Sequence, residues 1–374
     1  MKLSRSMIVL LLLAAGLTSG AHAAEPPAVS AESYILMDAA SGRALVSGSA
    51  DEPRLIASTT KIMTALIALE QCDPDREVVI DPAWTGIEGS TMYLIPGQVL
   101  TVRDLLYGLM LASGNDAAVA LACITAGDTD SFAALMNERA EELGCRNTHF
   151  ENPNGLDAQR HYSSAQDLAI IAREAIRNDE FRKIVSTVNA DICGRTFTNH
   201  NRLLRECEGV FGVKTGYTEA AGRTLVSCCE RDGITLICVT LDDPDDWADH
   251  AALYDWAYGN YVLEDIARYA SLSIPVIGGG SDEVTVTADG GAAVLRCSDD
   301  VLETRLCVPP FVFADIERGD RAGEAEVFVN GEKTAAVPLM FTESVDRLQT
   351  GDRTLRSRLL FLLSLFERKI FSLL

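Results

Sequence analysis

Residues 57–66 read A-S-T-T-K-I-M-T-A-L. Apolar side chains recur through residue 70 at helical spacing, so the stretch predicts an amphipathic helix over 59–70. Ser58 and Lys61 stand three residues apart at its start, which places both side chains on one face. Because a lysine, unlike an arginine, can lose its proton when it is desolvated, Lys61 could remove the proton of Ser58. Backbone N–H groups at the helix N-terminus would then face the developing oxyanion.

The same pair has a structural interpretation, in which Ser58 caps the helix and Lys61 is a solvated surface group. About one S-x-x-K match is expected by chance in a chain of ordinary composition and this length. Lysine is rare, however, with six lysines against 26 arginines, and Lys61 is the only lysine with a serine three residues before it. The chemical interpretation therefore depends on whether further motifs accompany the pair.

Two further motifs follow along the chain. Residues 113–115 read S-G-N, in a turn expected between helices over 103–111 and 116–126. Residues 214–216 read K-T-G, on a strand expected over 208–217, where Gly216 removes a side chain and lets a ligand backbone approach. All three motifs, in this order and each in a helix, turn or strand context, are difficult to attribute to chance.

This motif set is the one found in class A β-lactamases and penicillin-binding proteins. Beyond the motifs, the chain resembles low-molecular-weight penicillin-binding proteins, the D-alanyl-D-alanine carboxypeptidases of the peptidase S11 family, in the stretches 57–66, 100–109, 113–118, 147–150, 152–157 and 212–216. The resemblance runs from about residue 30 to the C-terminus. It implies an α/β (α+β) fold of the serine β-lactamase/DD-peptidase type, in which helices and a helical subdomain flank an antiparallel sheet.

The resemblance also implies the reaction, which is removal of the terminal D-alanine from the pentapeptide stems of peptidoglycan. Ser58 would be the nucleophile that forms an acyl-enzyme, with Lys61 as its general base, and water would release the acyl group. Ser113 would relay a proton to the leaving amine, and Asn115 would position the substrate. The charge of Lys214 would help to lower the pKa of Lys61. β-Lactams would act as inhibitors, and no cofactor is implied.

The K-T-G strand would bind the substrate by the same resemblance. Lys214 and Thr215 would hold the terminal carboxylate, beside Gly216. The backbone N–H groups of Ser58 and Tyr217 would form the oxyanion hole. The position of Tyr217 varies among such enzymes, so only its backbone is assigned a role.

Further elements are expected from the hydrophobic pattern and the turn residues. Helices are expected over 131–143, 164–177 and 247–259, and strands over 34–37, 44–46, 223–229 and 234–241. Past residue 270, short alternating runs between turn signals indicate a separate all-β domain. The expected division is a catalytic domain over 24–265 and a C-terminal β-sandwich over 266–350.

Both ends of the chain have patterns of their own. Residues 1–23 combine basic residues, an apolar run and an A-x-A end, which predicts a signal peptide cleaved after Ala23. Residues 351–374 predict a basic amphipathic helix, too short in its apolar run to span a bilayer, that binds the membrane surface through 352–374. The expected location is the outer face of the cytoplasmic membrane. Docking of this helix on the body of the protein is the alternative.

Composition argues against several other functions. With 54 acidic against 32 basic residues and no basic cluster in its body, the chain is a poor candidate for binding nucleic acid. Neither C-x-x-C nor H-E-x-x-H occurs, so no metal site is expected. We expect structural roles for His149 and His161. The ten cysteines are too sparse for a disulfide scaffold, and buried free thiols are favoured at least as much as bridges.

Three related interpretations stay open. A β-lactamase would need a carboxylate-activated water, but N-P-N-G-L-D occupies 152–157 and no E-x-x-L-N element lies between the second and third motifs. A DD-endopeptidase acting on cross-linked peptidoglycan would use the same machinery. A catalytically silent wall-binding protein is disfavoured because every motif residue is intact.

Overall fold

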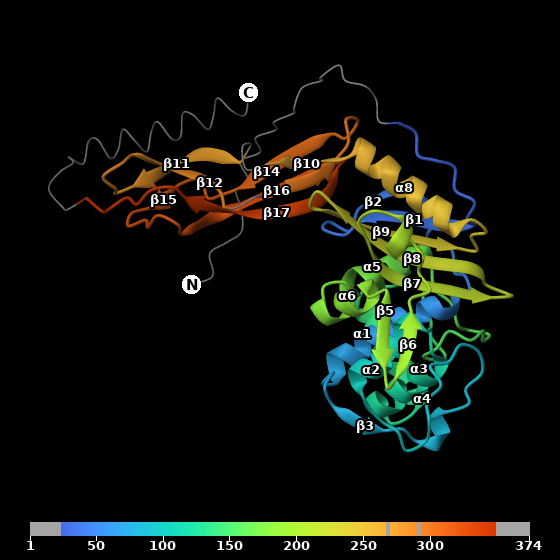
Figure 1. Cartoon of the computed structure of the whole chain (residues 1–374). Helices are drawn as coiled ribbons and strands as arrows, with labels where there is room; N and C mark the ends of the chain where they lie inside the picture. Colours follow the sequence, from blue (N-terminus) through green and yellow to red (C-terminus); the bar gives the residue numbers. More distant parts are fainter. Residues whose placement is uncertain (1–23, 267–269, 290–292, 349–374) are drawn as a thin grey trace. The chain divides into compact units, whose positions relative to one another are not determined.

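The computed structural model describes residues 24–266, 270–289 and 293–348. They divide into two units, the first ending at Val262 and the second beginning at Leu263 (Figure 1). The predicted signal peptide over 1–23 and the predicted anchor over 351–374 lie outside the described residues. The three motifs all belong to the first unit.

A five-stranded antiparallel sheet forms the framework of the first unit, in the order β2-β1-β9-β8-β7. Its strands are β1 (Ser33–Asp38), β2 (Ala44–Gly48), β7 (Val210–Thr218), β8 (Gly222–Arg231) and β9 (Ile234–Leu241). Strands β8 and β9 are buried along most of their length, because helices cover both faces of the sheet. The K-T-G motif lies on β7, at one edge of the sheet.

Helices cover this sheet on both sides (Figure 1). α8 (Asp246–Asn260) packs on one face against β8 and β9, and α5 (Ala165–Ala175) packs on the other face against β1 and β9. The other helical elements are η1 (Ala57–Thr60), α1 (Lys61–Gln71), η2 (Pro82–Trp84), α2 (Val102–Leu111), α3 (Asn115–Ala126), α4 (Thr129–Glu142), α6 (Asp179–Ser186) and α7 (Leu203–Glu206). No single described helix is long and apolar enough to cross a membrane, although α3 and α4 meet the length and composition test together, as a pair bent by 82°.

Helix α1 differs from the amphipathic helix that the sequence predicts. Residues 61–68 are all buried, because α2 to α6 and strand β7 pack around the helix. The interpretation of Lys61 as a solvated surface group is therefore wrong. Ser58 does not cap the helix either, since the N-cap is Thr60 and no side chain caps the first turn.

Two short hairpins and two short helices of the first unit have no counterpart in the sequence-based expectations. The hairpins are β3 (Glu77–Val79) with β4 (Val99–Thr101) and β5 (Asn189–Ile192) with β6 (Arg195–Thr198), and the helices are α6 and α7. Strands β5 and β6 have one buried residue each, so they lack the alternating apolar pattern from which a strand is recognised.

The second unit is built from strands, as expected. A six-stranded sheet has the order β14-β16-β17-β12-β11-β15, and β10 pairs with β13 in a two-stranded sheet. The strands are β10 (Val262–Asp265), β11 (Ser271–Ile277), β12 (Glu283–Ala288), β13 (Ala293–Arg296), β14 (Leu302–Cys307), β15 (Val312–Phe313), β16 (Arg321–Val329) and β17 (Glu332–Phe341). Alternate apolar residues of these strands, such as Val286, Val327 and Leu339, form a separate core. The all-β composition is confirmed.

Candidate active site

Ser58 lies in the turn η1, directly before α1, and several contacts fix this turn. Ala57 has a φ of 45°, a left-handed conformation that is strained for a residue with a Cβ. The carbonyl of Ala57 accepts a hydrogen bond from Thr60 Oγ1 at 2.8 Å. Gly155 packs so closely on this turn that a Cβ at its position would lie 1.9 Å from the same carbonyl oxygen. These contacts fix the backbone of the turn that carries Ser58.

His161 also stabilises this turn, through a hydrogen bond to Thr60. Its Nδ1 accepts from the backbone N–H of Glu151 at 3.1 Å, so Nε2 carries the proton and donates to Thr60 Oγ1 at 2.7 Å. Burial lowers the pKa of His161 to about 4. His149 donates from Nδ1 to the carbonyl of Arg160 at 2.6 Å. The structural roles expected for both histidines are confirmed.

Lys61 is completely buried, and its ammonium group has three oxygen acceptors. Nζ lies 2.8 Å from Ser58 Oγ, 2.7 Å from Asn115 Oδ1 and 2.5 Å from the carbonyl oxygen of Asn154. Burial lowers the pKa of Lys61 well below the ordinary value of a lysine, and the positive charge of Lys214 lowers it further. The predicted effect of Lys214 is confirmed, with burial as the larger cause. A neutral Lys61 at this position can accept the proton of Ser58.

The S-G-N motif connects α2 to α3, as predicted. Ser113 is held at a φ of 57°, and its side chain lines the same cleft as Ser58. The side chain of Asn115 has a partner at each end. Its Oδ1 accepts from Lys61, and its Nδ2 donates to the carbonyl of Glu88 at 2.6 Å. The structure thus shows Asn115 orienting Lys61, while its contact with substrate stays a prediction.

Asp116 directly follows the motif and was not singled out from the sequence. Its side chain is 1% exposed and accepts from Thr91 Oγ1 at 2.6 Å and from the backbone N–H groups of Met92 and Leu94, each at 3.0 Å. A buried carboxylate with several donors is strongly anchored. Asp116 therefore fixes the 91–94 segment against the start of α3.

The K-T-G motif brings β7 against the turn that holds Ser58. A Cβ on Gly216 would lie 2.9 Å from the backbone nitrogen of Ser58. The sequence suggested that Gly216 admits a ligand backbone, and the structure shows that its missing side chain leaves room for the Thr224 hydroxyl and for the backbone of Ser58. The side chain of Tyr217 is 68% exposed, which is consistent with a role for its backbone alone.

Lys214 lies beneath this surface. Its side chain is 1% exposed, and Nζ donates to the carbonyl of Thr215 at 2.8 Å. Burial lowers the pKa of Lys214 to about 7. Thr215, but not Lys214, is among the residues that line the cleft. The predicted contact of Lys214 with the terminal carboxylate of the substrate stays a prediction.

A cleft of about 320 Å³ brings the three motifs together. Its lining residues are Ser58, Ser90, Ser113, His200, Thr215, Gly216, Tyr217, Arg223, Asp246 and Trp247. Arg223 donates from Nη2 to the two carboxylate oxygens of Asp246 at 2.7 and 3.0 Å, and its guanidinium lies 5.4 Å from the centroid of the Trp247 ring. A serine, a buried lysine and a carboxylate-binding arginine in one cleft can carry out acyl transfer on a substrate with a free carboxylate.

Five of the residues that line the cleft were not predicted from the sequence. Arg223 faces Tyr217 in the register of β7 and β8, so counting back across the hairpin from the K-T-G motif would have found it. Ser90 and His200 lie in irregular segments, and Asp246 and Trp247 lie at the start of α8. No local pattern marks them, because only the packing of distant segments places them beside Ser58.

No cysteine is among the described residues that line the cleft. All ten cysteines are free thiols in the structure, and Cys228, Cys229 and Cys238 are buried. Burial raises the pKa of Cys228, which makes its thiol a poor nucleophile. Within the described residues, no group of three His, Cys, Asp or Glu side chains is arranged to hold a metal ion.

Comparisons with known proteins agree with this geometry. The model of the D-alanyl-D-alanine carboxypeptidase family, peptidase S11, matches residues 20–245. The chain is 30% identical over 335 residues to D-alanyl-D-alanine carboxypeptidase DacF of Bacillus subtilis, with 85% of this chain and 86% of DacF covered. It is 32% identical over 356 residues to D-alanyl-D-alanine carboxypeptidase DacC of Escherichia coli, with 86% of each covered. The crystal structure of penicillin binding protein 5 from Haemophilus influenzae is similar at a TM-score of 0.70 and 28% identity, covering 87% of this chain and 100% of that one.

Proposed function

The chain belongs to the D-alanyl-D-alanine carboxypeptidase family, peptidase S11, and on that premise we propose that Ser58 carries out the family's reaction in this cleft. The protein is a serine-type, penicillin-binding D-Ala-D-Ala carboxypeptidase. It removes the terminal D-alanine from peptidoglycan pentapeptide stems through an acyl-enzyme. The assignment of Ser58 rests on the 2.8 Å contact between its Oγ and Nζ of the fully buried Lys61.

Acylation begins with proton transfer from Ser58 to neutral Lys61. Oγ then attacks the carbonyl carbon of the penultimate D-alanine, and the N–H groups of Ser58 and Tyr217 stabilise the oxyanion. Gly216 lies close to the backbone nitrogen of Ser58, which supports the assignment of the Ser58 and Tyr217 N–H groups to one oxyanion hole. Ser113 passes a proton to the leaving amine as the C–N bond breaks, and water later hydrolyses the ester.

Thr215 and Arg223 hold the terminal carboxylate of the substrate, with the charge of Lys214 beneath them. Both side chains line the cleft, and Asp246 orients the guanidinium of Arg223. Because burial holds the pKa of Lys214 at about 7, a bound carboxylate favours its protonated form. The arrangement selects substrates that end in a free carboxylate next to the scissile bond.

The cleft favours a carboxypeptidase over a β-lactamase. Asp246 is the only acidic residue among the described residues that line it, and Arg223 already pairs with that carboxylate. The N-P-N-G-L-D segment contributes the carbonyl of Asn154 to Lys61, where a β-lactamase would need a carboxylate to activate water. Acyl-enzymes formed from penicillins should therefore be long-lived.

The location of the enzyme is a further part of the proposal. The signal pattern over 1–23 supports export, and the basic amphipathic pattern over 352–374 supports binding to the outer face of the cytoplasmic membrane. Export would also bring the cleft to its substrate, since peptidoglycan lies outside that membrane.

Two measurements test the assignment of Ser58. Mass spectrometry of the penicillin-treated protein should place the acyl adduct on the peptide that contains Ser58, and Ser58→Ala should abolish the adduct. The wild-type protein should release free D-alanine from a pentapeptide, and Ser58→Ala should not. An adduct on any other peptide would contradict the mechanism.

A further inference from the structure

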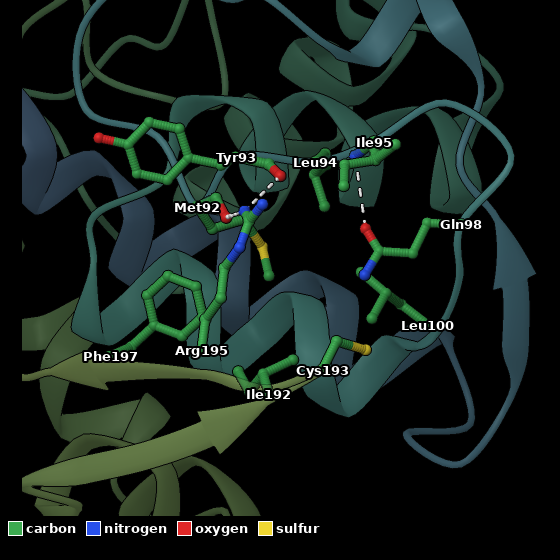
Figure 2. A pocket seen from close by; sticks show the side chains of 10 residues that line it. All are labelled: Met92, Tyr93, Leu94, Ile95, Gln98, Leu100, Ile192, Cys193, Arg195 and Phe197. Atoms are coloured by element: carbon green, nitrogen blue, oxygen red, sulfur yellow. Dashed lines mark hydrogen bonds between the residues drawn. The ribbon is translucent and has the colours of Figure 1, made fainter.

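Exposed apolar side chains occur in both units, and two of those in the first unit line a small pocket (Figure 2). Tyr93 and Ile95 line this pocket, which has a volume of about 60 Å³. Arg195 lines it too, and its Nη1 donates to the carbonyl of Tyr93 at 2.9 Å and to that of Met92 at 3.5 Å. Pockets that bind small molecules are several times larger, so this pocket carries no ligand site. A pair of exposed phenylalanines in the second unit has a different setting.

Phe311 and Phe313 lie at one edge of the six-stranded sheet of the second unit. The edge strand is β15, and it pairs in parallel with β11, with Phe313 opposite Ile277 (Figure 1). Successive side chains of a strand point to opposite faces, so Val312 packs against the core of this unit and the two phenylalanines lie outside it. They are 38% and 65% exposed, and their ring centroids lie 5.5 Å apart in an edge-to-face arrangement. The two rings form an apolar patch that the core of the unit does not use.

The described chain ends beside this phenylalanine pair. Ala314, which follows Phe313, and Leu348 donate their backbone N–H groups to the carbonyls of residues 277 and 278, at the end of β11, at 3.1 and 2.9 Å. Arg347 Nη2 donates to the carbonyl of Ala314 at 3.0 Å. The segment predicted to bind the membrane surface starts at residue 352, and the four residues from Leu348 to this point span at most about 14 Å. The pair therefore lies close to any surface that the start of this segment binds.

The backbone before the pair is suited to an apolar surface. Pro309 and Pro310 precede Phe311, and a proline has no N–H group. An unpaired backbone N–H is costly in the apolar part of a bilayer. The two prolines reduce the number of such groups in this segment.

The charges near the pair do not favour anionic lipids. Among residues 315–318 and 346–347, three are acidic and two are basic. Asp315 accepts the backbone N–H of Arg347 at 2.7 Å, so a carboxylate and a guanidinium lie together at this end of the unit. Attraction to anionic lipids would come from the basic residues of 352–374, whereas the phenylalanines would contribute apolar burial. Salt screens the first contribution and leaves the second unchanged.

We propose that Phe311 and Phe313 enter the interface of a phospholipid bilayer and form a second membrane contact beside the anchor of residues 352–374. This inference rests on the proposed attachment of that segment to the outer face of the cytoplasmic membrane. Aromatic rings at the level of the lipid head groups bury apolar area that the second unit leaves exposed. The pair adds to the anchor and does not replace it, since the anchor has many more apolar side chains. The contact places this end of the second unit against the lipid.

Tryptophan fluorescence tests the contact, because the three tryptophans of the chain all lie in the first unit. In Phe313→Trp of the mature full-length protein, vesicles of phosphatidylcholine and phosphatidylglycerol with brominated acyl chains should quench the added emission. Val301→Trp is the matched control, since Val301 is 67% exposed and directly precedes β14, at the opposite edge of the same sheet. Its added emission should not be quenched. Equal quenching of the two variants would overturn the proposal.

A binding measurement gives an independent readout. Replacing both Phe311 and Phe313 by serine should raise the Kd for the same vesicles about tenfold, because apolar burial is lost. The ratio to wild type should persist at high salt, since salt does not screen apolar burial. Val301→Ser should leave the Kd unchanged. An unchanged Kd in the double variant at both salt concentrations would contradict the contact.

The failure of this contact can be distinguished from the failure of the anchor. A wild-type protein that binds vesicles, while the emission of Phe313→Trp is not quenched, would overturn the contact and leave the anchor standing. A wild-type protein that binds no vesicles would overturn both. Emission of Phe313→Trp that is blue-shifted without lipid, and shifts to the red on deletion of residues 352–374, would show that this segment covers the pair instead. A blue shift that grows with protein concentration would show that a second copy of the chain covers it.

Discussion

Lys61 shows how burial makes a base from a residue that is usually an acid. Its ammonium has three acceptors, yet the loss of water around it lowers its pKa well below the ordinary lysine value. Desolvation penalises the charged form, and Lys214 adds repulsion. The three acceptors can bind the charged ammonium of Lys61, and burial favours its neutral amine. A general base must adopt both of these forms.

Replacement of Lys61 by arginine should be as damaging as replacement by alanine. A guanidinium is not deprotonated in a protein and cannot accept the proton of Ser58, so we expect acylation by a reporter β-lactam to slow about a thousandfold or more. Stopped-flow acylation measures this rate. Lys214→Arg is the comparison, because charge is the proposed role of Lys214 and arginine should keep part of the activity. Near-normal acylation by Lys61→Arg would show that only positive charge matters at that position.

At the scale of elements, single side chains hold segments of the site together. The 91–94 segment has no regular structure, and Asp116 supplies acceptors for its N–H groups. In Asp116→Asn, the new amide N–H₂ group would replace the oxygen that now accepts from Thr91 and Leu94. We expect the free energy of unfolding to fall by about 2–4 kcal/mol, because buried donors lose their acceptor. Urea denaturation measures this change.

The exposed Asp130, in the first turn of α4, provides the control for that measurement. Asp130→Asn should change the free energy of unfolding by less than about 0.5 kcal/mol. An equally small change in Asp116→Asn would mean that the segment is held by other contacts.

The segment before β1 is attached to the loop and helix that follow β9 through a pair of carboxylates. Ser30 donates from its backbone N–H to Asp249 Oδ2 at 2.6 Å and from Oγ to Asp243 Oδ1 at 2.8 Å. Burial raises the pKa of Asp243 to about 6, and the nearby charge of Asp249 raises it further, against hydrogen bonds from Ser30, Thr240 and Asp245. The folded protein therefore binds this proton more tightly than the unfolded chain does.

This proton makes stability depend on pH in a defined direction. The unfolded chain loses the proton of Asp243 near pH 4 and the folded protein loses it near pH 6, so this group's contribution to stability is complete below pH 4. It is lost as the pH rises between these values. The measurement is the free energy of unfolding of wild type and Asp243→Asn between pH 4 and 8. The variant should gain stability relative to wild type as the pH rises, and a constant difference would show that Asp243 does not titrate in this range.

At the scale of the whole molecule, the residues assigned to catalysis all lie in the first unit. The strands of the second unit share a separate core. The predicted anchor lies outside the described part of the chain. Its removal takes away no residue that is assigned to catalysis, so catalysis and attachment to a surface can be tested separately.

Deletion of residues 352–374 should release the enzyme from membranes and leave its activity on small peptides unchanged. Five basic side chains of this segment favour anionic lipids, at about 1 kcal/mol each, and its leucines add apolar burial. Sedimentation with anionic vesicles at low and high salt measures the binding, which salt should weaken but not abolish. A mature full-length protein that stays in the supernatant at low salt would refute the anchor. Loss of peptide hydrolysis on truncation would favour the helix docked on the protein.

Local chemistry explains what could be predicted from the sequence. The S-x-x-K, S-x-N and K-T-G motifs, the helices α1 to α5 and α8, and the strands β7 to β9 follow from spacings and hydrophobic periods a few residues long. The roles of Ser58 and Lys61 depend on residues three positions apart. These features were therefore predictable before any tertiary contact was known.

Only the tertiary structure decided the environment of those residues. The burial of Lys61 depends on five helices and a strand that come from distant parts of the chain, and its acceptor at Asn154 is a backbone carbonyl with no sequence signature. Ser90 and His200 join the cleft through packing alone. A pKa or a cavity depends on everything that excludes water from a point, and that is a property of the folded chain rather than of any short segment.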